Sequence, residues 1–219
     1  MITYETIKND KTIKTYIERA DDVMKAIGYT EHSFAHVTRV AKTAGDILLS
    51  LGYDERTVEL TRIAGYMHDI GNVVNRVDHS QSGALIAFRL LDKLGMDPDE
   101  ICLIVSAIGN HDEGYGEPVS PMAAALILAD KSDVRRSRVR SARADSSDIH
   151  DAVNYSVTSS RLSFCGEEKT ICLDLEIDTS VATVFDFFEI FTTRMMLCRK
   201  AAKTLGAEFR LTANGQRLI

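Results

Sequence analysis

The heptapeptide YMHDIGN, residues 66–72, places His68 directly before Asp69 at the end of an apolar run that begins at Val58. The run has helical spacing, and Gly71 indicates that the backbone turns just after the pair, so that both side chains can face a cleft. An imidazole nitrogen and a carboxylate oxygen are ligands suited to zinc, iron, manganese or nickel. Because an isolated His-Asp pair is more often a polar pair at a helix end, its interpretation depends on the rest of the chain.

The composition is that of a globular protein with one sizeable core. The chain has 219 residues, is 45% hydrophobic and carries a net charge of -6, and no apolar run is long enough to span a bilayer. The N-terminus lacks a basic region before an apolar stretch, so we expect no signal peptide. The 4 cysteines have no CxxC spacing and are expected to be reduced thiols of a cytoplasmic protein. The acidic net charge argues against a nucleic-acid partner, and the absence of a span argues against a membrane.

Apolar residues at three- and four-residue spacing predict a series of helices in the first part of the chain. The helices are expected at residues 11–27, 31–51, 55–68, 79–94, 98–111 and 122–133. Asp54 is a suitable N-cap and Pro98 a suitable first residue of a helix, while Gly28, Gly52 and Gly95 mark helix ends. We therefore predict a mainly α fold.

The pattern changes after residue 144. Alternating apolar residues predict two strands, a long helix follows, and Asn214-Gly215 predicts a final hairpin. The strands and helix are expected at residues 155–164, 169–177 and 179–205. We predict a helical domain, residues 1–144, and a small β-β-α-β appendage, residues 145–219. Because so few strands cannot bury both faces of a sheet alone, the appendage is expected to pack on the helices or to form a homodimer interface.

Further histidines and an aspartate lie at or near the ends of the predicted helices, at His36, His79, His111 and Asp130. Asp130 is the most informative, because it follows the apolar run 123–129 and a carboxylate is costly to bury unless a cation offsets its charge. The alternative for Asp130 is a helix-end aspartate paired with Lys131. Most of the histidines lie in the helical part, and metal sites in bundles draw ligands from several helices. His32 lies one turn before His36 and is left outside the predicted ligand set.

One segment is basic. Residues 131–143 contain Lys131 and five arginines, among them Arg135. Such a short cluster can bind a small phosphorylated ligand more readily than a long polymer, although a solvated surface segment has the same composition.

The order His36, His68-Asp69, Asp130 resembles the H…HD…D pattern of the HD-domain superfamily of metal-dependent phosphohydrolases, over about residues 30–140. The segment HSQSGA from His79 resembles the HxxxGA motif of the dinuclear branch of that superfamily. The segments AIGNH, ending at His111, and ADKSDVR, from Ala129, resemble later motifs of the same branch. By these contexts the chain is similar to bacterial hydrolases of symmetrical dinucleoside tetraphosphates, and similar histidines occur in cyclic-dinucleotide phosphodiesterases.

The resemblance implies an HD-type helical bundle that holds one or two divalent metal ions, with iron, manganese and zinc all compatible with mixed nitrogen and oxygen ligands. The first metal would be bound by His36, His68, Asp69 and Asp130. The second would be bound by His79 and His111, with Asp69 bridging both. The ions would activate water and neutralise phosphoryl oxygens during hydrolysis of a phosphoester or phosphoanhydride.

The resemblance also implies roles for side chains beside the metals. Arg135 and Lys131 would bind phosphate, Arg135 through a bidentate contact. Lys131 and Asp112 would join Asp69 in the catalytic group, with Asp112 positioning water or the leaving group, or orienting His111. Tyr115 lies in a loop that could close as a lid, and would stack on a base of the substrate; an exposed loop tyrosine is the alternative.

Two departures from the family concern the substrate. Asn72 stands where these relatives usually carry lysine, and Asp112 where they often carry threonine or histidine. The leading hypothesis is a metal-dependent phosphohydrolase acting on a nucleotide or another small phosphorylated compound. One alternative is a regulatory or binding module that retains the metal site. The other is a di-iron oxygenase on the same scaffold, which the basic segment disfavours.

Overall fold

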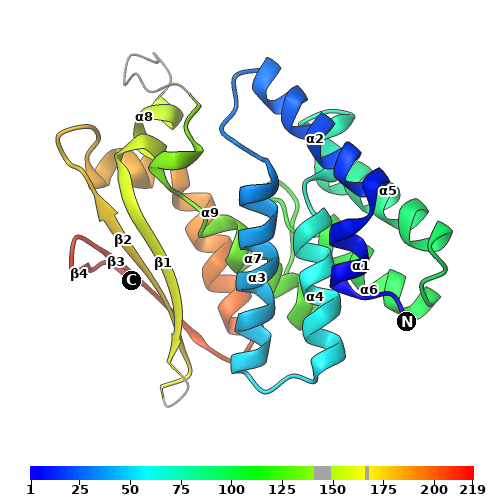
Figure 1. The fold of residues 1–219 in the computed structure, drawn as a ribbon. Coiled ribbons are helices and arrows are strands. Elements are labelled where there is room, and N and C mark those ends of the chain that lie inside the picture. Colours follow the sequence, from blue (N-terminus) through cyan, green and yellow to red (C-terminus); the bar gives the residue numbers. More distant parts are fainter. Residues whose placement is uncertain (141–148, 166–167) are drawn as a thin grey trace.

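The computed structural model describes residues 1–140, 149–165 and 168–219. The expected domain boundary at residue 144 lies outside the described residues, as does most of the turn expected at 166–168, so the division into two domains stays a prediction. Within the described ranges, no helix has the length and apolarity needed to cross a membrane. The chain is mainly helical, with a small sheet near its C-terminus, as predicted (Figure 1).

The first part of the chain is a helical bundle. Its helices are α1 (Tyr4–Asn9), α2 (Lys11–Ala26), α3 (Phe34–Ser50), α4 (Glu55–Met67), α5 (His79–Lys93), α6 (Pro98–Gly109) and α7 (Pro121–Lys131), with short 3-10 helices η1 (Ile70–Val73) and η2 (Arg136–Arg138). α7 is buried on every side from Met122 to Lys131 and contacts α3, α4 and α6. These three helices therefore pack around α7, which lies at the centre of the core.

The predicted helix boundaries are confirmed to within a few residues, and local capping explains them. Asp54 caps α4 by accepting a hydrogen bond from the Thr57 amide, and Pro98 is the first residue of α6. α1 was not predicted, because it is one short helix with a single buried residue, Ile7, and shows no helical period. Its start is set by Thr3, which accepts a hydrogen bond from the Thr6 amide.

The C-terminal part contains a four-stranded sheet with the order β1-β2-β3-β4. Its elements are α8 (Ile149–Ser156), β1 (Val157–Cys165), β2 (Thr170–Ile177), α9 (Val184–Thr204), β3 (Glu208–Ala213) and β4 (Gln216–Arg217). β1 and β2 are antiparallel, β2 and β3 are parallel across the α9 connection, and β3 and β4 are antiparallel. α9 contacts both β3 and α7, so it joins the sheet to the helical bundle (Figure 1).

Two predictions for this part were wrong in detail. The segment before Val157 is helix α8 rather than the start of a strand. The long helix begins at Val184 rather than at residue 179, because Thr183 and Asp186 form a capping box and Asp178 accepts hydrogen bonds in a preceding turn. The final hairpin is confirmed, and Asn214 and Gly215 both have positive φ, as its tight turn requires.

Two helices that carry candidate ligands approach closely because of a glycine. A Cβ atom on Gly65 of α4 would lie 2.7 Å from the Cα of Ala41 on α3. The bare glycine thus lets the two backbones touch. This contact brings His36 of α3 beside His68 at the end of α4.

Candidate metal centre

The structure brings together all of the predicted metal-ligating residues. His36 comes from α3, His68 and Asp69 follow α4, His79 begins α5, His111 follows α6 and Asp130 lies near the end of α7. All six are buried, Asp130 being the most accessible at 9%. Every element ends or begins at the same point in the bundle, which is why residues far apart in the sequence meet there.

The first group of donor atoms comes from His36, His68, Asp69 and Asp130. His36 Nε2 lies 3.3 Å from Asp130 Oδ1 and 3.4 Å from Asp69 Oδ2, and His68 Nε2 lies 3.5 Å and 3.2 Å from the same two oxygens. Ligand atoms about 2.1 Å from one ion are about 3.0–3.4 Å apart along the edges of an octahedron or tetrahedron. The spacing of these donors fits a single cation.

The second group lies on the other side of Asp69. His79 Nε2 is 3.2 Å from His111 Nε2 and 3.5 Å from Asp69 Oδ1. The two oxygens of Asp69 therefore face different groups of histidines, which is the arrangement that a bridging carboxylate needs. Arg76 places a cation beside this group, with NH1 3.1 Å from His79 Nε2. A metal ion bound by the second group would have to displace this guanidinium from His79 Nε2.

Asn72, at the position where relatives usually carry lysine, holds the bridging carboxylate. Its side-chain amide donates to Asp69 Oδ1 at 2.9 Å and to the Asp69 carbonyl at 2.9 Å. The departure from the family pattern therefore preserves the orientation of Asp69, although it replaces a charged group by a neutral one.

Each histidine of the centre is held by its other ring nitrogen. Nδ1 lies 2.7 Å from Asp133 Oδ2 in His36, 2.8 Å from the Gly65 carbonyl in His68, 3.0 Å from the Arg76 carbonyl in His79 and 2.6 Å from the Ile108 carbonyl in His111. Because these partners accept hydrogen bonds, Nδ1 is the protonated nitrogen and the Nε2 lone pairs point inward. Among the described residues, Nε2 of His36 and of His68 is buried without a hydrogen-bond partner. Such inward lone pairs beside carboxylates fit a divalent cation.

The charges of the centre also call for a cation. Burial raises the pKa of Asp69 and of Asp130, but the histidines around them and, for Asp130, Lys131 lower these pKa values well below the usual range. Burial lowers the pKa of His68, yet Asp69 and Asp130 raise it to about 10. A proton thus balances the carboxylates where a metal ion is absent. Metal binding would displace that proton, so affinity should fall as the pH falls.

Lys131 and Asp112 lie beside the centre, as predicted for catalytic side chains, although their roles stay predictions. The Lys131 ammonium is 2.7 Å from Asp130 Oδ2 and 2.6 Å from Glu113 Oε2. Asp112 Oδ1 is 3.7 Å from Lys131 Nζ and 3.9 Å from His79 Nε2. Lys131 is therefore a buried cation fixed by carboxylates, and Asp112 is at the edge of the second group.

The structure does not bring the other predicted substrate-binding residues to the centre. Arg135 is bound to Asp133, with Nε 2.8 Å from Oδ1, and does not line the cavity. Tyr115 is 88% exposed and does not line the cavity either. Arg135 was predicted because a guanidinium can bind phosphate through a bidentate contact, but its guanidinium instead pairs with the Asp133 carboxylate.

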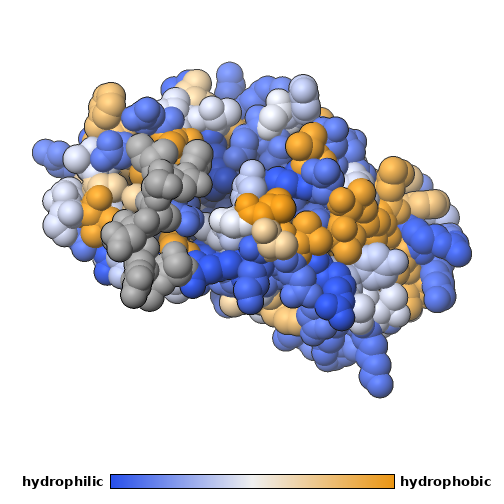
Figure 2. All heavy atoms as spheres, turned by 90° about the horizontal axis from the view of Figure 1, so that it is seen from above, coloured by the Kyte–Doolittle hydropathy of each residue, from blue (hydrophilic) through white to orange (hydrophobic). Residues whose placement is uncertain are grey.

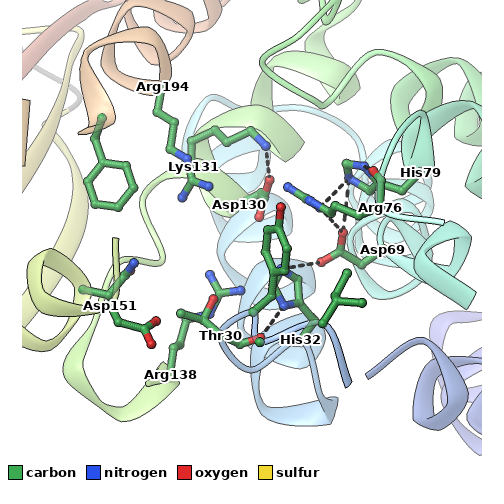
Figure 3. Close-up of a pocket in the computed structure, with 15 residues that line it drawn as sticks. Thr30, His32, Asp69, Arg76, His79, Asp130, Lys131, Arg138, Asp151 and Arg194 are labelled. Carbon is green, nitrogen blue, oxygen red and sulfur yellow. Dashed lines mark hydrogen bonds and ion pairs between the residues drawn. The ribbon is translucent and has the colours of Figure 1, made fainter. Parts of the chain in front are cut away.

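A cavity of about 240 Å³ opens beside the metal centre and is lined by side chains outside the predicted ligand and substrate-binding sets (Figure 3). They include His32, Arg76, Arg138 and Arg194. His32 has Nδ1 2.7 Å from the Thr30 carbonyl and Nε2 4.0 Å from Asp69 Oδ2, so it resembles the predicted ligands in orientation. The sequence signal that could have identified His32 as part of the site is its position one helical turn before His36. Arg194 comes from α9, and no sequence signal links it to this site.

Asp133 is a second residue that was missed, and it leads to a prediction. Its carboxylate accepts from His36 Nδ1 and pairs with Arg39 at 3.0 Å and Arg135 at 2.8 Å. In Asp133→Asn the amide can donate to His36 Nδ1, which favours the tautomer with the proton on Nε2. We expect metal affinity to fall by about tenfold to a hundredfold, measured by competition with a chromogenic chelator. Asp46→Asn, which removes a half-buried carboxylate of α3 that pairs with Lys42 and Arg62, is the control. Equal affinities in the two variants would show that Asp133 does not set the orientation of His36.

Comparison with known proteins gives two findings. The model of the HD domain matches residues 33–135. An uncharacterized protein of Methanocaldococcus jannaschii is 26% identical, in an alignment that covers 87% of this chain and 81% of that protein. The matched region of the family model contains all six residues of the centre.

Proposed function

From the premise that residues 33–135 are an HD domain, the domain of a superfamily of metal-dependent phosphohydrolases, we propose that this chain hydrolyses a small phosphorylated compound. The observation that carries the proposal is the set of inward imidazole nitrogens around two carboxylates. When bound there, divalent ions would lower the pKa of water and neutralise phosphoryl charge. Iron, manganese and zinc all suit the donor set.

The chain's own residues would prepare the reaction in three ways. The carboxylate of Asp69 and the imidazoles around it fix the positions of the cations, because each is held by a second hydrogen bond. Lys131, whose pKa is raised mainly by Asp130 and Glu113 against the effect of burial, keeps its charge and would stabilise phosphoryl oxygens. Asp112, at the edge of the centre, would accept a proton from water or return one to the leaving group.

The cavity favours a compact substrate. Its volume of about 240 Å³ is near the lower end of small-molecule sites. We therefore favour a single nucleotide or a phosphorylated compound of similar size over the symmetrical dinucleoside tetraphosphates of the similar hydrolases. The charges favour phosphate over the uncharged substrate of an oxygenase, because Arg76, Lys131, Arg138 and Arg194 all line the cavity.

Metal removal tests the proposal. The protein, purified without air or chelator, is expected to contain at least about one divalent ion per chain by mass spectrometry and to hydrolyse p-nitrophenyl phosphate or bis-p-nitrophenyl phosphate. Chelation should abolish hydrolysis, and manganese or iron should restore it. A protein that remains metal-free and inactive after reconstitution with iron, manganese and zinc would contradict the proposal and favour a binding module.

The predicted homodimer stays a prediction. Hydrophobic residues gather in patches on one face of the molecule (Figure 2). Along η1 and α5, Val74, Val77, Leu85 and Phe88 are exposed by 49–73%. A surface of this kind can bind a partner, and the mass of the protein in solution decides whether that partner is a second copy.

A further inference from the structure

The cavity contains cations that the reaction at the metal ligands does not use. Its charged lining, apart from histidines, consists of Asp69, Asp130, Asp151, Arg76, Lys131, Arg138 and Arg194. Lys131 is paired with Asp130 and Glu113, and Arg76 lies beside His79. Arg138 and Arg194 are left to be explained. Any metal ion at the centre adds further positive charge to a cavity in which cations already outnumber carboxylates.

Arg138 is a buried cation with neutral partners. It is only 4% exposed, its Nε donates to the Glu31 carbonyl at 2.9 Å, and its NH1 donates to the Asp133 carbonyl at 2.9 Å. Over the described ranges of the chain, no carboxylate forms an ion pair with Arg138. Burial lowers its pKa, because the guanidinium loses hydration, while Asp133, Asp130 and Asp69 raise it from beyond ion-pair distance. A buried guanidinium that no carboxylate contacts directly is costly, and an anionic ligand in the cavity would offset that cost.

Arg194 reaches the same cavity from α9 and is held in place. Its Nε lies 2.9 Å from Glu113 Oε1, and its guanidinium lies 4.8 Å from the centre of the Phe191 ring. Glu113 also pairs with Lys131 at 2.6 Å, so its single charge is shared by two cations. The two contacts fix the orientation of Arg194, and because Glu113 is shared with Lys131, Arg194 has no carboxylate to itself.

Figure 3 shows Arg194 above and Arg138 below the cavity, with Asp130 and Asp69 to the right of both. The two arginines come from η2 and α9, on different sides of the space that leads away from the metal ligands. Their guanidinium groups can bind phosphate or carboxylate oxygens in the bidentate manner that lysine cannot. A group hydrolysed at the metal ligands would therefore leave room for another anionic group between the arginines.

We propose that Arg138 and Arg194 form a second anion subsite, which binds an anionic group of the substrate other than the one that is hydrolysed. This inference rests on the proposed function and narrows its substrate class. The substrate carries at least two anionic groups, as phosphoanhydrides and bisphosphates do. The α9 helix then contributes directly to substrate binding, and the HD domain alone is an incomplete site.

Binding of two simple anions to the full chain tests the subsite. Inorganic phosphate and methylenediphosphonate, which is not hydrolysed, are titrated calorimetrically into manganese-loaded protein, so that one anionic group binds at the metal centre and only the second group of methylenediphosphonate reports the arginines. Methylenediphosphonate is expected to bind about tenfold more tightly than phosphate, and Arg194→Met to remove about tenfold of its affinity while changing phosphate affinity by less than about twofold. Arg199→Met, at an exposed arginine of the same helix, is the control.

Arg138→Met should have the same selective effect as Arg194→Met. If the variant of the buried Arg138 does not fold, the variant of the partly exposed Arg194 still tests the subsite. Equal losses for both anions would overturn the inference, because the arginines would then serve a single phosphate. Unchanged binding of methylenediphosphonate in Arg194→Met would overturn it too.

Activity separates this inference from the proposed function. If manganese-loaded protein hydrolyses p-nitrophenyl phosphate but shows no preference for methylenediphosphonate, the subsite is wrong and the function stands. If no ester is hydrolysed but Arg194→Met selectively weakens methylenediphosphonate binding, the function is wrong and the subsite stands. If the protein shows both ester hydrolysis and the preference for methylenediphosphonate, Arg194→Met should raise the KM for a nucleoside 5′-diphosphate by about tenfold. The KM for p-nitrophenyl phosphate should stay nearly unchanged.

Discussion

Asp69→Asn is expected to abolish phosphohydrolase activity, lowering kcat/KM by about a thousandfold, and to weaken metal binding by about a hundredfold or more. One carboxylate oxygen, Oδ2, lies 3.2 Å from His68 Nε2 and 3.4 Å from His36 Nε2, whereas Oδ1 lies 3.5 Å from His79 Nε2. Asparagine has the same shape but one oxygen and no charge. It therefore removes an anionic ligand from both groups of donors at once.

The measurement is metal content by mass spectrometry together with p-nitrophenyl phosphate hydrolysis. Asp92→Asn is the control for loss of a carboxylate, because Asp92 is an exposed residue of α5 that pairs with Arg89. The unfolding midpoint of metal-free Asp69→Asn should fall, because buried His68 loses a carboxylate partner, so metal content is compared at a temperature at which the variant is folded. Retention of metal and activity in the variant would exclude Asp69 as a ligand.

Gly71→Ala is expected to destabilise the protein by about 3 kcal/mol and lower its Tm by about 10 °C, and to displace His79 from the centre. A Cβ on Gly71 would lie 1.9 Å from the His79 carbonyl oxygen and 2.4 Å from the Gly83 amide nitrogen. Both atoms belong to the backbone at the start of α5, so they cannot rotate away. The helix must shift, and its first residue is a ligand of the second group.

Thermal unfolding and metal content measure the two effects. Gly109→Ala is the matched control, because the nearest atom to its new Cβ, in Ala84, would be 3.7 Å away, an ordinary contact. In Gly71→Ala, the second group of donor atoms should lose its metal ion before the first group does. A variant as stable as the control, with unchanged metal content, would show that η1 and α5 need no such close approach.

The metal-binding part of the site could be predicted because its ligands are marked by local sequence. His68 and Asp69 end an apolar helix, and Asp130 follows a run in which every residue is buried. A polar residue in such a context has few roles, and the resemblance to the HD-domain superfamily joined these residues into one predicted ligand set. The HD-domain match over residues 33–135 confirms the superfamily.

The substrate side of the cavity could not be predicted in the same way. Arg138 and Arg194 reach it from η2 and α9, through tertiary contacts to Glu31, Asp133 and Glu113 that no spacing rule encodes. Arg135 was predicted instead, because it lies in the basic segment and a guanidinium can bind phosphate through a bidentate contact. The strands themselves were predicted more closely, since their apolar residues alternate and Asn214-Gly215 marks the last turn, whereas the parallel pairing of β2 with β3 was not predicted.

The position of α9 has a consequence for biosynthesis. Domains fold from the N-terminus as the ribosome adds about 5–20 residues per second. Every predicted metal ligand precedes residue 131, whereas Arg194 and Phe191 are made near the end of the chain. Under the proposed function, a nascent chain would be able to bind its ions while the cavity is still open on the side of α9. Because α9 closes that side, metal loading during synthesis would precede completion of the proposed substrate site.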